Sequence, residues 1–181
     1  MNLQKIFWVL RVLLYKPFLG KVGLLSYMCK PIYLSNPQKI FLGSRVRIYP
    51  GMRAETVGDG AKIVIGNNIP IGQNFHVVSY CHELTIGDDT TVAGNVFITN
   101  CDHDYKSKNN SVLESDILYK KTSVGKSCFI GNNVAILSGT NLGDGCIVGA
   151  NSVLKGDYPA NSVIVGVPGK VIKRYTKEKS L

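Results

Sequence analysis

The chain has 181 residues, of which 45% are hydrophobic and 18% are charged, with a formal net charge of +9 and 19 glycines spread along its length. This composition indicates a folded chain of about one domain with many tight turns, and it excludes an intrinsically disordered one. The five cysteines are odd in number and form no CxxC pair, which favours a reduced, cytoplasmic setting over a disulfide framework.

The excess positive charge lies entirely in the first third of the chain. Residues 1–54 contain nine basic side chains and no acidic one, and Glu55 is the first acid. Such an asymmetry predicts an anionic partner, either nucleic acid or a membrane surface. Because the same stretch is rich in apolar residues and carries no nucleic-acid-binding motif, we favour the membrane surface.

Residues 6–15 are nearly all apolar and predict a helix that stops near Pro17. Its apolar face would consist of Ile6, Val9, Leu10 and Leu13. The run is shorter than the ~20 residues that span a bilayer, and no alanine precedes Ala54 to form an Ala-x-Ala cleavage site. We therefore interpret residues 1–39 as a retained segment that either caps the rest of the fold or makes a peripheral contact with the membrane.

A dipeptide of an aliphatic residue and glycine then begins to recur. It occurs at Leu42-Gly43, Ile65-Gly66, Ile71-Gly72 and Ile86-Gly87. The spacing of nine from Val77 to Ile86 predicts an extra turn around Ser79 to His82. The spacing of 26 from Ile98 to Val124 predicts that the polar residues 102–121 leave the regular structure as a long loop.

From Val124 onward the recurrence is strict. An aliphatic residue stands at every sixth position: Val124, Ile130, Ile136, Leu142, Val148 and Leu154. Small or β-branched residues follow four positions later, at Cys128, Val134, Thr140, Cys146 and Ser152. A period of six matches neither a helix nor a plain alternating strand. It is typical of short strands joined by sharp bends, three of which would close a triangular coil whose residues stack 18 positions apart.

This pattern resembles the hexapeptide-repeat acyltransferases, and most of all the sugar O-acetyltransferases of the galactoside and maltose type. The resemblance covers about residues 40–170. It implies an all-β solenoid, a left-handed parallel β-helix over residues 40–173, followed by a tail at 174–181. It also implies acetyl-CoA as co-substrate, no metal, and a homotrimer with active sites between neighbouring chains.

The resemblance places the catalytic histidine at the root of the extruded loop, on His103. A sugar hydroxyl becomes a nucleophile only when a base active near neutral pH takes its proton, and the oxygen would then attack the thioester directly. Asp102 and Asp104 are candidates to orient the ring or to contact substrate. The alternatives are that His103 is a surface loop histidine and that the two aspartates are solvated loop acids. By position, His76 and Ser79 are candidates for the acceptor site, with ordinary turn residues as the equal alternative.

The sequence Gly166-Val167-Pro168-Gly169-Lys170 resembles the coenzyme A-binding end of the family. Carried across by position, the resemblance assigns cofactor contacts to Asn132, Ala150, Lys155, Gly156, Lys170 and Lys173. The lysines would neutralise phosphate, and the pantetheine arm would form hydrogen bonds along successive coil edges. The alternative for the lysines is a solvated basic tail. The Gly166–Lys170 turn argues against this alternative for Lys170, and less so for Lys173.

The leading hypothesis is O-acetylation of a saccharide hydroxyl in capsule, O-antigen or exopolysaccharide synthesis, with a lipid-linked acceptor as one form. Alternatives are N-acetylation of an amino sugar and a non-catalytic β-helical scaffold. A metal-dependent hydratase on the same fold would need His76, His82 and His103 to converge on one ion. The spacing of the first two tends to place them on different faces, so we expect no metal site.

Overall fold

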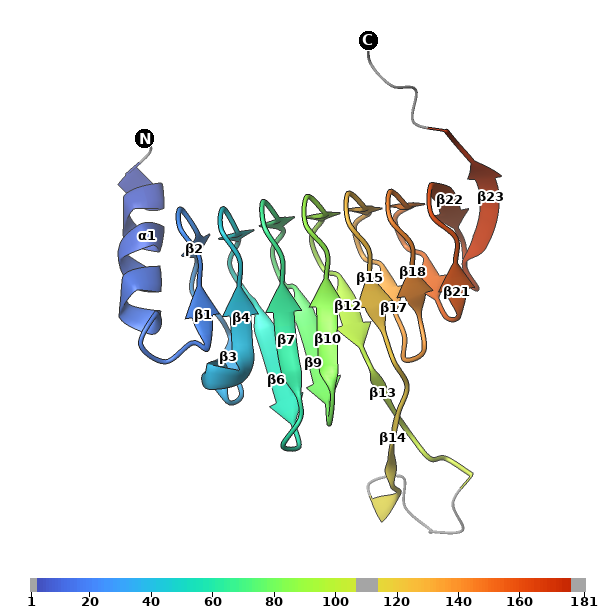
Figure 1. Cartoon of the computed structure of the whole chain (residues 1–181), viewed down its shortest axis with the longest axis horizontal. Coiled ribbons are helices and arrows are strands. Elements are labelled where there is room, and N and C mark those ends of the chain that lie inside the picture. The colour runs from blue at the N-terminus through green and yellow to red at the C-terminus, as the bar shows by residue number, and fades with distance from the viewer. Residues whose placement is uncertain (1–2, 107–113, 177–181) are drawn as a thin grey trace.

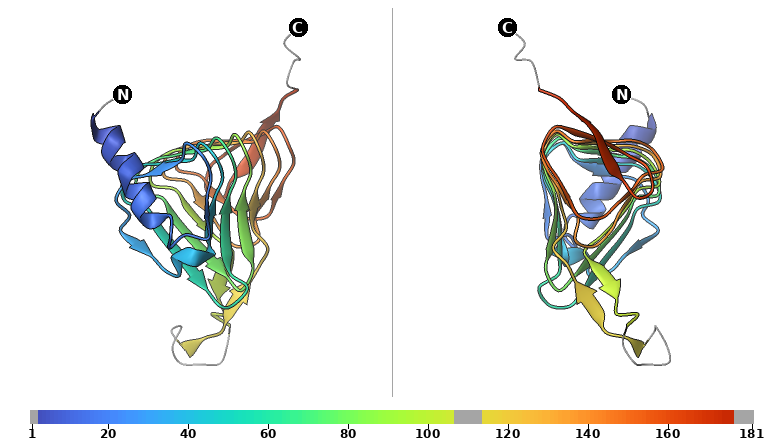
Figure 2. Two further views of the ribbon diagram at one scale, coloured as in Figure 1. Left: turned by 60° about the vertical axis from the view of Figure 1, so that its left-hand side comes forward. Right: turned by 90° about the vertical axis from the view of Figure 1, so that its right-hand side faces the viewer.

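The computed structural model describes residues 3–106 and 114–176. It confirms that the six-residue recurrence forms short strands joined by bends, since β15 (Ser123–Val124), β16 (Phe129–Ile130) and β17 (Ala135–Ile136) follow one another at this spacing. Three strands complete one coil, and the coils stack into a left-handed parallel β-helix with a triangular cross-section (Figure 2).

Each face of this prism is one sheet. Sheet A contains β1 (Lys21–Val22), β4 (Ile40–Leu42), β7 (Lys62–Ile65), β10 (Glu83–Ile86), β15, β18 (Asn141–Leu142) and β21 (Asp157–Tyr158). Sheet B contains β2 (Tyr27–Met28), β5 (Arg47–Ile48), β8 (Pro70–Ile71), β11 (Thr91–Val92), β16, β19 (Ile147–Val148), β22 (Ser162–Val165) and the antiparallel β23 (Lys170–Arg174). Sheet C contains β3 (Tyr33–Leu34), β6 (Arg53–Val57), β9 (His76–Tyr80), β12 (Phe97–Thr99), β17 and β20 (Val153–Leu154).

The core is the column of aliphatic side chains inside the prism. Ile86 pairs with Val124, and Val124 pairs with Leu142 one coil further on, as the 18-residue repeat predicts. All six aliphatic residues of the strict repeat are at most 3% exposed. Burying such a side chain contributes about 1.5–3 kcal/mol, and here the burial depends on stacking against the next coil.

The corners show why glycine and asparagine recur there. A Cβ on Gly131 would lie 2.7 Å from the backbone nitrogen of Ala150 and 2.7 Å from the carbonyl oxygen of Val148, so a side chain would push the coils apart. Asn133 and Asn151 both adopt φ of +59°, a conformation that asparagine tolerates. The Nδ2 of Asn133 donates to the Oδ1 of Asn151 at 2.8 Å, which ties the two corners together.

The N-terminal helix α1 (Leu3–Tyr15) ends before Pro17, as predicted, and lies across the open end of the first coil (Figure 1). Val12 is buried, and the ring of Trp8 packs 5.7 Å from that of Tyr27. Within the described residues, no helix has the length and hydropathy needed to cross a membrane.

The β-helix starts earlier than predicted. β1, β2, β3 and the short 3-10 helix η1 (Pro37–Lys39) already form a complete coil, so the boundary that we predicted at residue 40 is wrong. Val22, Met28 and Leu34 carry the six-residue period. Only Val22 is followed by glycine, which is why the glycine-based pattern missed this coil.

The predicted extruded loop is present. β13 (Cys101–His103) and β14 (Ile117–Tyr119) form an antiparallel hairpin that projects from the corner between sheets C and A (Figure 1). Residues 107–113 of the predicted loop and 177–181 of the predicted tail lie outside the described residues.

Candidate active site

A pocket of about 370 Å³ opens on the outer face of sheet C, where the hairpin leaves the coil. Its lining residues are Val78, Phe97, Thr99, Cys101, Asp102, His103, Ile117, Leu137 and Ser138. The walls are mainly aliphatic and aromatic with a few convergent polar groups, which is the usual composition of a small-molecule site. Residues of three successive coils and both strands of the hairpin thus meet around His103.

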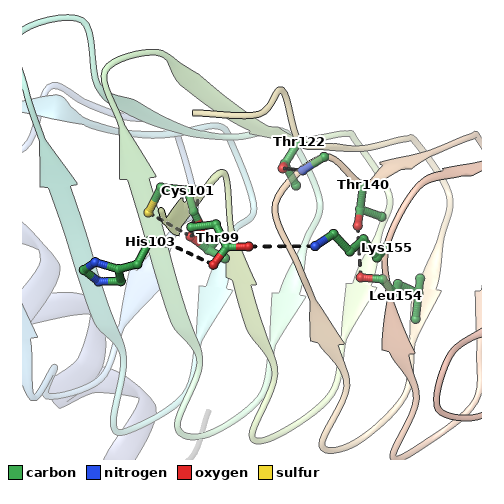
Figure 3. Close-up of polar contacts among 9 residues, drawn as sticks. Thr99, Cys101, His103, Thr122, Thr140, Leu154 and Lys155 are labelled. Atoms are coloured by element: carbon green, nitrogen blue, oxygen red, sulfur yellow. Dashed lines mark hydrogen bonds and ion pairs between the residues drawn. The ribbon is translucent and has the colours of Figure 1, made fainter. Parts of the chain in front are cut away.

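His103 is exposed at the end of β13, opposite Ile117. Its backbone N–H donates to the Oδ1 of Asp102 at 3.0 Å, while the Oδ2 of Asp102 lies 3.8 Å from the Nζ of Lys155. The Oδ1 of Asp104 accepts from the backbone N–H of Lys106 at 3.1 Å. Both carboxylates therefore hold the root of the hairpin in these contacts, and the imidazole points away from Lys155, toward the N-terminal coils (Figure 3).

Cys101 also lines the pocket, beside Thr99. Its Sγ is 3.3 Å from the Oγ1 of Thr99, and burial is the main cause that raises the pKa of the thiol. Only a thiolate is an efficient nucleophile, so this environment keeps Cys101 unreactive.

Ser138 contributes an unusual group to the pocket. Its side chain is 1% exposed, and its Oγ is the one buried side-chain oxygen or nitrogen without a hydrogen-bond partner in the described part of the chain. Buried polar groups are almost always paired, because an unpaired one costs free energy. Nothing in the sequence pattern marked this residue, which stands on an inward-facing position next to the positive-φ Gly139.

His76 lies on the same face of sheet C, one strand from Phe97. Its Nε2 is 2.9 Å from the Oε1 of Glu55, and its ring centroid is 5.0 Å from that of Phe97. Arg53 donates from its Nε to the same Glu55 oxygen at 2.7 Å. This bond from Arg53 is the main cause that lowers the pKa of Glu55, with the His76 contact adding to it.

Ser79 does not reach this face, and the structure contradicts its assignment as an acceptor residue. Its side chain is fully buried, and its hydroxyl lies 2.9 Å from the carbonyl oxygen of Lys62 and 2.7 Å from that of His82. Side chains alternate along a strand, so His76 faces outward on β9 and Ser79 faces inward. The hydroxyl stabilises the extra turn predicted there.

The three histidines do not converge. His82 packs its ring 4.2 Å from that of Tyr119, while His76 contacts Glu55 and His103 stands on β13. Across residues 3–106 and 114–176, no three His, Cys, Asp or Glu side chains are grouped in a way that could hold a metal ion.

The predicted coenzyme A residues fall at two different corners. Asn132 and Ala150 lie one coil apart at the corner between sheets B and C, and Lys170 begins β23 opposite Val165 at the same end of sheet B. Lys155 and Gly156 follow β20 at the corner between sheets C and A. Sheet C separates the two groups, and Lys173 lies further along the edge of sheet B, opposite Val163.

Comparisons with known proteins give a consistent result. The family model described as bacterial transferase hexapeptide (six repeats) matches residues 121–156. The chain is 35% identical over 179 residues to WbbJ of Escherichia coli K12, which is named as an O-acetyl transferase of lipopolysaccharide biosynthesis; the match covers 94% of this chain and 88% of WbbJ. It is 31% identical over 131 residues to the galactoside O-acetyltransferase of the same organism, covering 65% of this chain and 63% of that protein.

Solved structures share the fold. AntD, an N-acyltransferase from Bacillus cereus in complex with dTDP and 3-hydroxybutyryl-CoA, superposes with a TM-score of 0.74 at 20% identity, covering 92% of this chain and 89% of AntD. A galactoside acetyltransferase in complex with coenzyme A gives a TM-score of 0.64 at 24% identity, with 91% and 69% of the two chains covered.

Proposed function

This chain belongs to the hexapeptide-repeat acetyltransferases, and from that membership we propose that it transfers an acetyl group from acetyl-CoA to a hydroxyl of a saccharide in capsule, O-antigen or exopolysaccharide synthesis. The observation that carries the proposal is the pocket on sheet C, with His103 at its mouth and few polar groups around it. The relatives named as O-acetyl transferases of lipopolysaccharide and galactoside support the choice of a hydroxyl acceptor.

We propose His103 as the general base. The imidazole takes the proton of the acceptor hydroxyl, and the oxygen forms a bond to the carbonyl carbon of the thioester. The tetrahedral intermediate then breaks its carbon–sulfur bond, and the departing thiolate of coenzyme A receives the proton from the imidazolium. The products are an acetyl ester and free coenzyme A, with no acyl-enzyme.

We propose that one coenzyme A contacts two chains. Asn132 and Ala150 would follow the pantetheine arm along the B–C corner, with Lys170 toward the phosphates and Lys173 beyond it. Lys155 and Gly156 stand at the opposite edge of sheet C, so they would reach the same cofactor only from a neighbouring chain. This arrangement supports a homotrimer with its sites between chains.

Mixing two inactive variants tests the shared site. His103→Ala removes the base, and Ala150→Trp blocks the exposed B–C corner. If each site takes these residues from different chains, random mixed trimers regain about a quarter of the wild-type activity. If both residues serve a site within one chain, the mixture stays as inactive as its two components, and the shared site is wrong.

The reaction itself is tested by incubating the enzyme with acetyl-CoA and a panel of hydroxyl and amino glycosides. We expect release of coenzyme A thiol only with certain hydroxyl acceptors, and a product whose acetyl group is removed by mild alkali, as an ester is. An alkali-stable amide product would support N-acetylation instead. Absence of transfer to every member of a broad panel would leave the scaffold alternative.

We also propose that the capped end of the prism contacts the membrane. Eight apolar side chains there are at least half exposed: Phe7, Leu10, Leu13, Leu14, Phe18, Leu24, Leu25 and Ile32. We call these eight the end patch. Lys16, Lys21 and Lys30 are exposed in the same segment, which contains no acid. Apolar surface combined with basic charge is suited to anionic lipid.

Sedimentation with vesicles tests this contact. We expect the protein to bind vesicles of phosphatidylglycerol and to release them in high salt, because the lysine contribution is screened. Phe18→Glu, in the end patch, should weaken binding, whereas Ile172→Glu, at an equally exposed apolar position on β23, should not. Equal effects of the two changes would contradict a specific contact through the end patch.

A further inference from the structure

Sheet C carries a second group of polar and aromatic side chains next to the pocket. We propose that Tyr33, Arg53, Glu55 and His76 form a saccharide-binding subsite, which extends the acceptor site from the pocket toward the capping helix. The acceptor would then be an oligosaccharide rather than a single sugar. This inference rests on the proposed function and names the class of acceptor that it serves.

The register of the strands aligns this group with the pocket. Phe97, which lines the pocket, pairs with His76; His76 pairs with Arg53; and Arg53 pairs with Tyr33. These four residues stand on one outward-facing row, and at the usual strand spacing the row is about 14 Å long. Such a row is longer than one sugar ring, and it begins at the pocket wall.

The polar side chains of this group are held in place and remain accessible. One oxygen of Glu55 holds both the Nε of Arg53 at 2.7 Å and the Nε2 of His76 at 2.9 Å. The side chains of Arg53, His76 and Glu55 are 48%, 35% and 24% exposed, so a ligand can reach them. A carboxylate and a planar guanidinium held in place can accept from and donate to neighbouring hydroxyls of a sugar.

Aromatic rings flank this polar group on both sides. The ring of Phe97 is 5.0 Å from that of His76, and the Cζ of Arg53 is 5.7 Å from the ring centroid of Tyr33. Aromatic faces pack against the C–H faces of sugar rings, while the polar groups fix their hydroxyls. The pocket itself is mainly apolar, so most hydroxyls of an oligosaccharide must find their partners outside it.

Stability does not explain the group equally well. Exposed ion pairs contribute little to folding because water screens them and their side chains lose freedom. Saccharide binding, in contrast, explains why these three side chains converge beside a pocket. The imidazole of His103 also points toward these N-terminal coils, so the acetylated sugar and the rest of the chain would lie on the same side (Figure 3).

The far end of the row meets an apolar groove. Tyr33 lines both the subsite and a groove of about 340 Å³ that it shares with Tyr15, Phe18, Ile32 and Leu34. An acceptor that runs along sheet C would therefore leave the enzyme at the capped end, beside the end patch. That direction suits an oligosaccharide carried on an apolar anchor, with its sugar chain reaching up to His103.

Chain length of the acceptor tests the proposal. The probes are p-nitrophenyl monosaccharides and tetrasaccharides of galactose, glucose, rhamnose and N-acetylglucosamine. The sugar series with the highest turnover is used for the comparison. Glu55→Gln and Arg53→Ala should lower kcat/KM for the tetrasaccharide about 10- to 100-fold, the loss expected from hydrogen bonds to charged groups. The monosaccharide should change less than about twofold.

Glu83→Gln is the matched control, because Glu83 is an exposed strand carboxylate on sheet A. It should leave both probes unchanged. If the Glu55 and Arg53 variants lose kcat/KM equally on both probes, the group contacts the reacting sugar. If they lose kcat/KM on neither probe, the group is a surface ion pair. Both results overturn the subsite. Saturation-transfer NMR can also measure binding of the tetrasaccharides to His103→Ala in the absence of acetyl-CoA. This measurement tests the subsite even if the enzyme acetylates none of the probes.

Discussion

Ser138→Ala removes the unpaired hydroxyl beneath the pocket. The Oγ of Ser138 is buried and has no hydrogen-bond partner among residues 3–106 and 114–176, so those residues do not compensate its desolvation. We expect the variant to be more stable than the wild type by about 1 kcal/mol, the lower end of the cost of an unsatisfied buried group. For a chain of this size, that corresponds to a rise in Tm of about 2–4 °C.

Ser79→Ala is the matched comparison, since Ser79 is equally buried on sheet C but its hydroxyl reaches two carbonyl oxygens. It should lower stability by about 1–2 kcal/mol, because a buried carbonyl loses its donor. Calorimetry at one protein concentration measures both changes, and fixed concentration matters for an oligomer.

Opposite signs for the two serines support the reasoning. A fall in Tm for Ser138→Ala similar to that for Ser79→Ala would refute it, because the hydroxyl would then have a partner in the folded state.

Two further predictions follow from the titrating groups. Burial raises the pKa of the Cys128 thiol to about 11. Iodoacetamide at pH 8 should therefore leave Cys128 unlabelled in the native protein and label it after unfolding in urea, as measured by peptide mass analysis. Labelling of Cys128 in the native protein would contradict this prediction. Arg53 and then His76 lower the pKa of Glu55, so its contribution to stability is complete above the ordinary value of about 4.3 and is lost as pH falls through the lowered pKa. Urea unfolding of the wild type and Glu55→Gln should therefore differ more at pH 7 than at pH 3, and a constant difference would argue against the ion pair.

The core and the departure of the chain from the prism after Ile98 could be predicted because both depend on the sequence period alone, whereas the pairing of the loop as a hairpin could not. Val124 and Leu142 stack because their separation equals one coil, and the interrupted spacing after Ile98 requires the chain to leave the prism. The first coil was missed because it keeps the aliphatic period at Met28 and Leu34 without the glycines. Burial of aliphatic side chains holds the strands of this coil in place, and the spacing of glycines does not indicate that burial.

The polar group on sheet C could not be predicted from spacing. Arg53 and His76 are 23 residues apart, and His76 and Phe97 are 21 apart, because turns of different length are inserted between coils. Their alignment depends on strand register, which only the folded chain fixes. The position of Ser79, in contrast, was open to prediction, since strand alternation places it on the opposite face from His76.

The role of His103 is measured by the rate of acetyl transfer by His103→Ala at saturating acetyl-CoA and acceptor, with coenzyme A affinity measured by calorimetry on the same preparation. Loss of a general base should lower kcat by about 10²- to 10⁴-fold and leave the Kd for coenzyme A nearly unchanged. A kcat close to that of the wild type would contradict the role of His103 and the assignment of the pocket on sheet C as the active site.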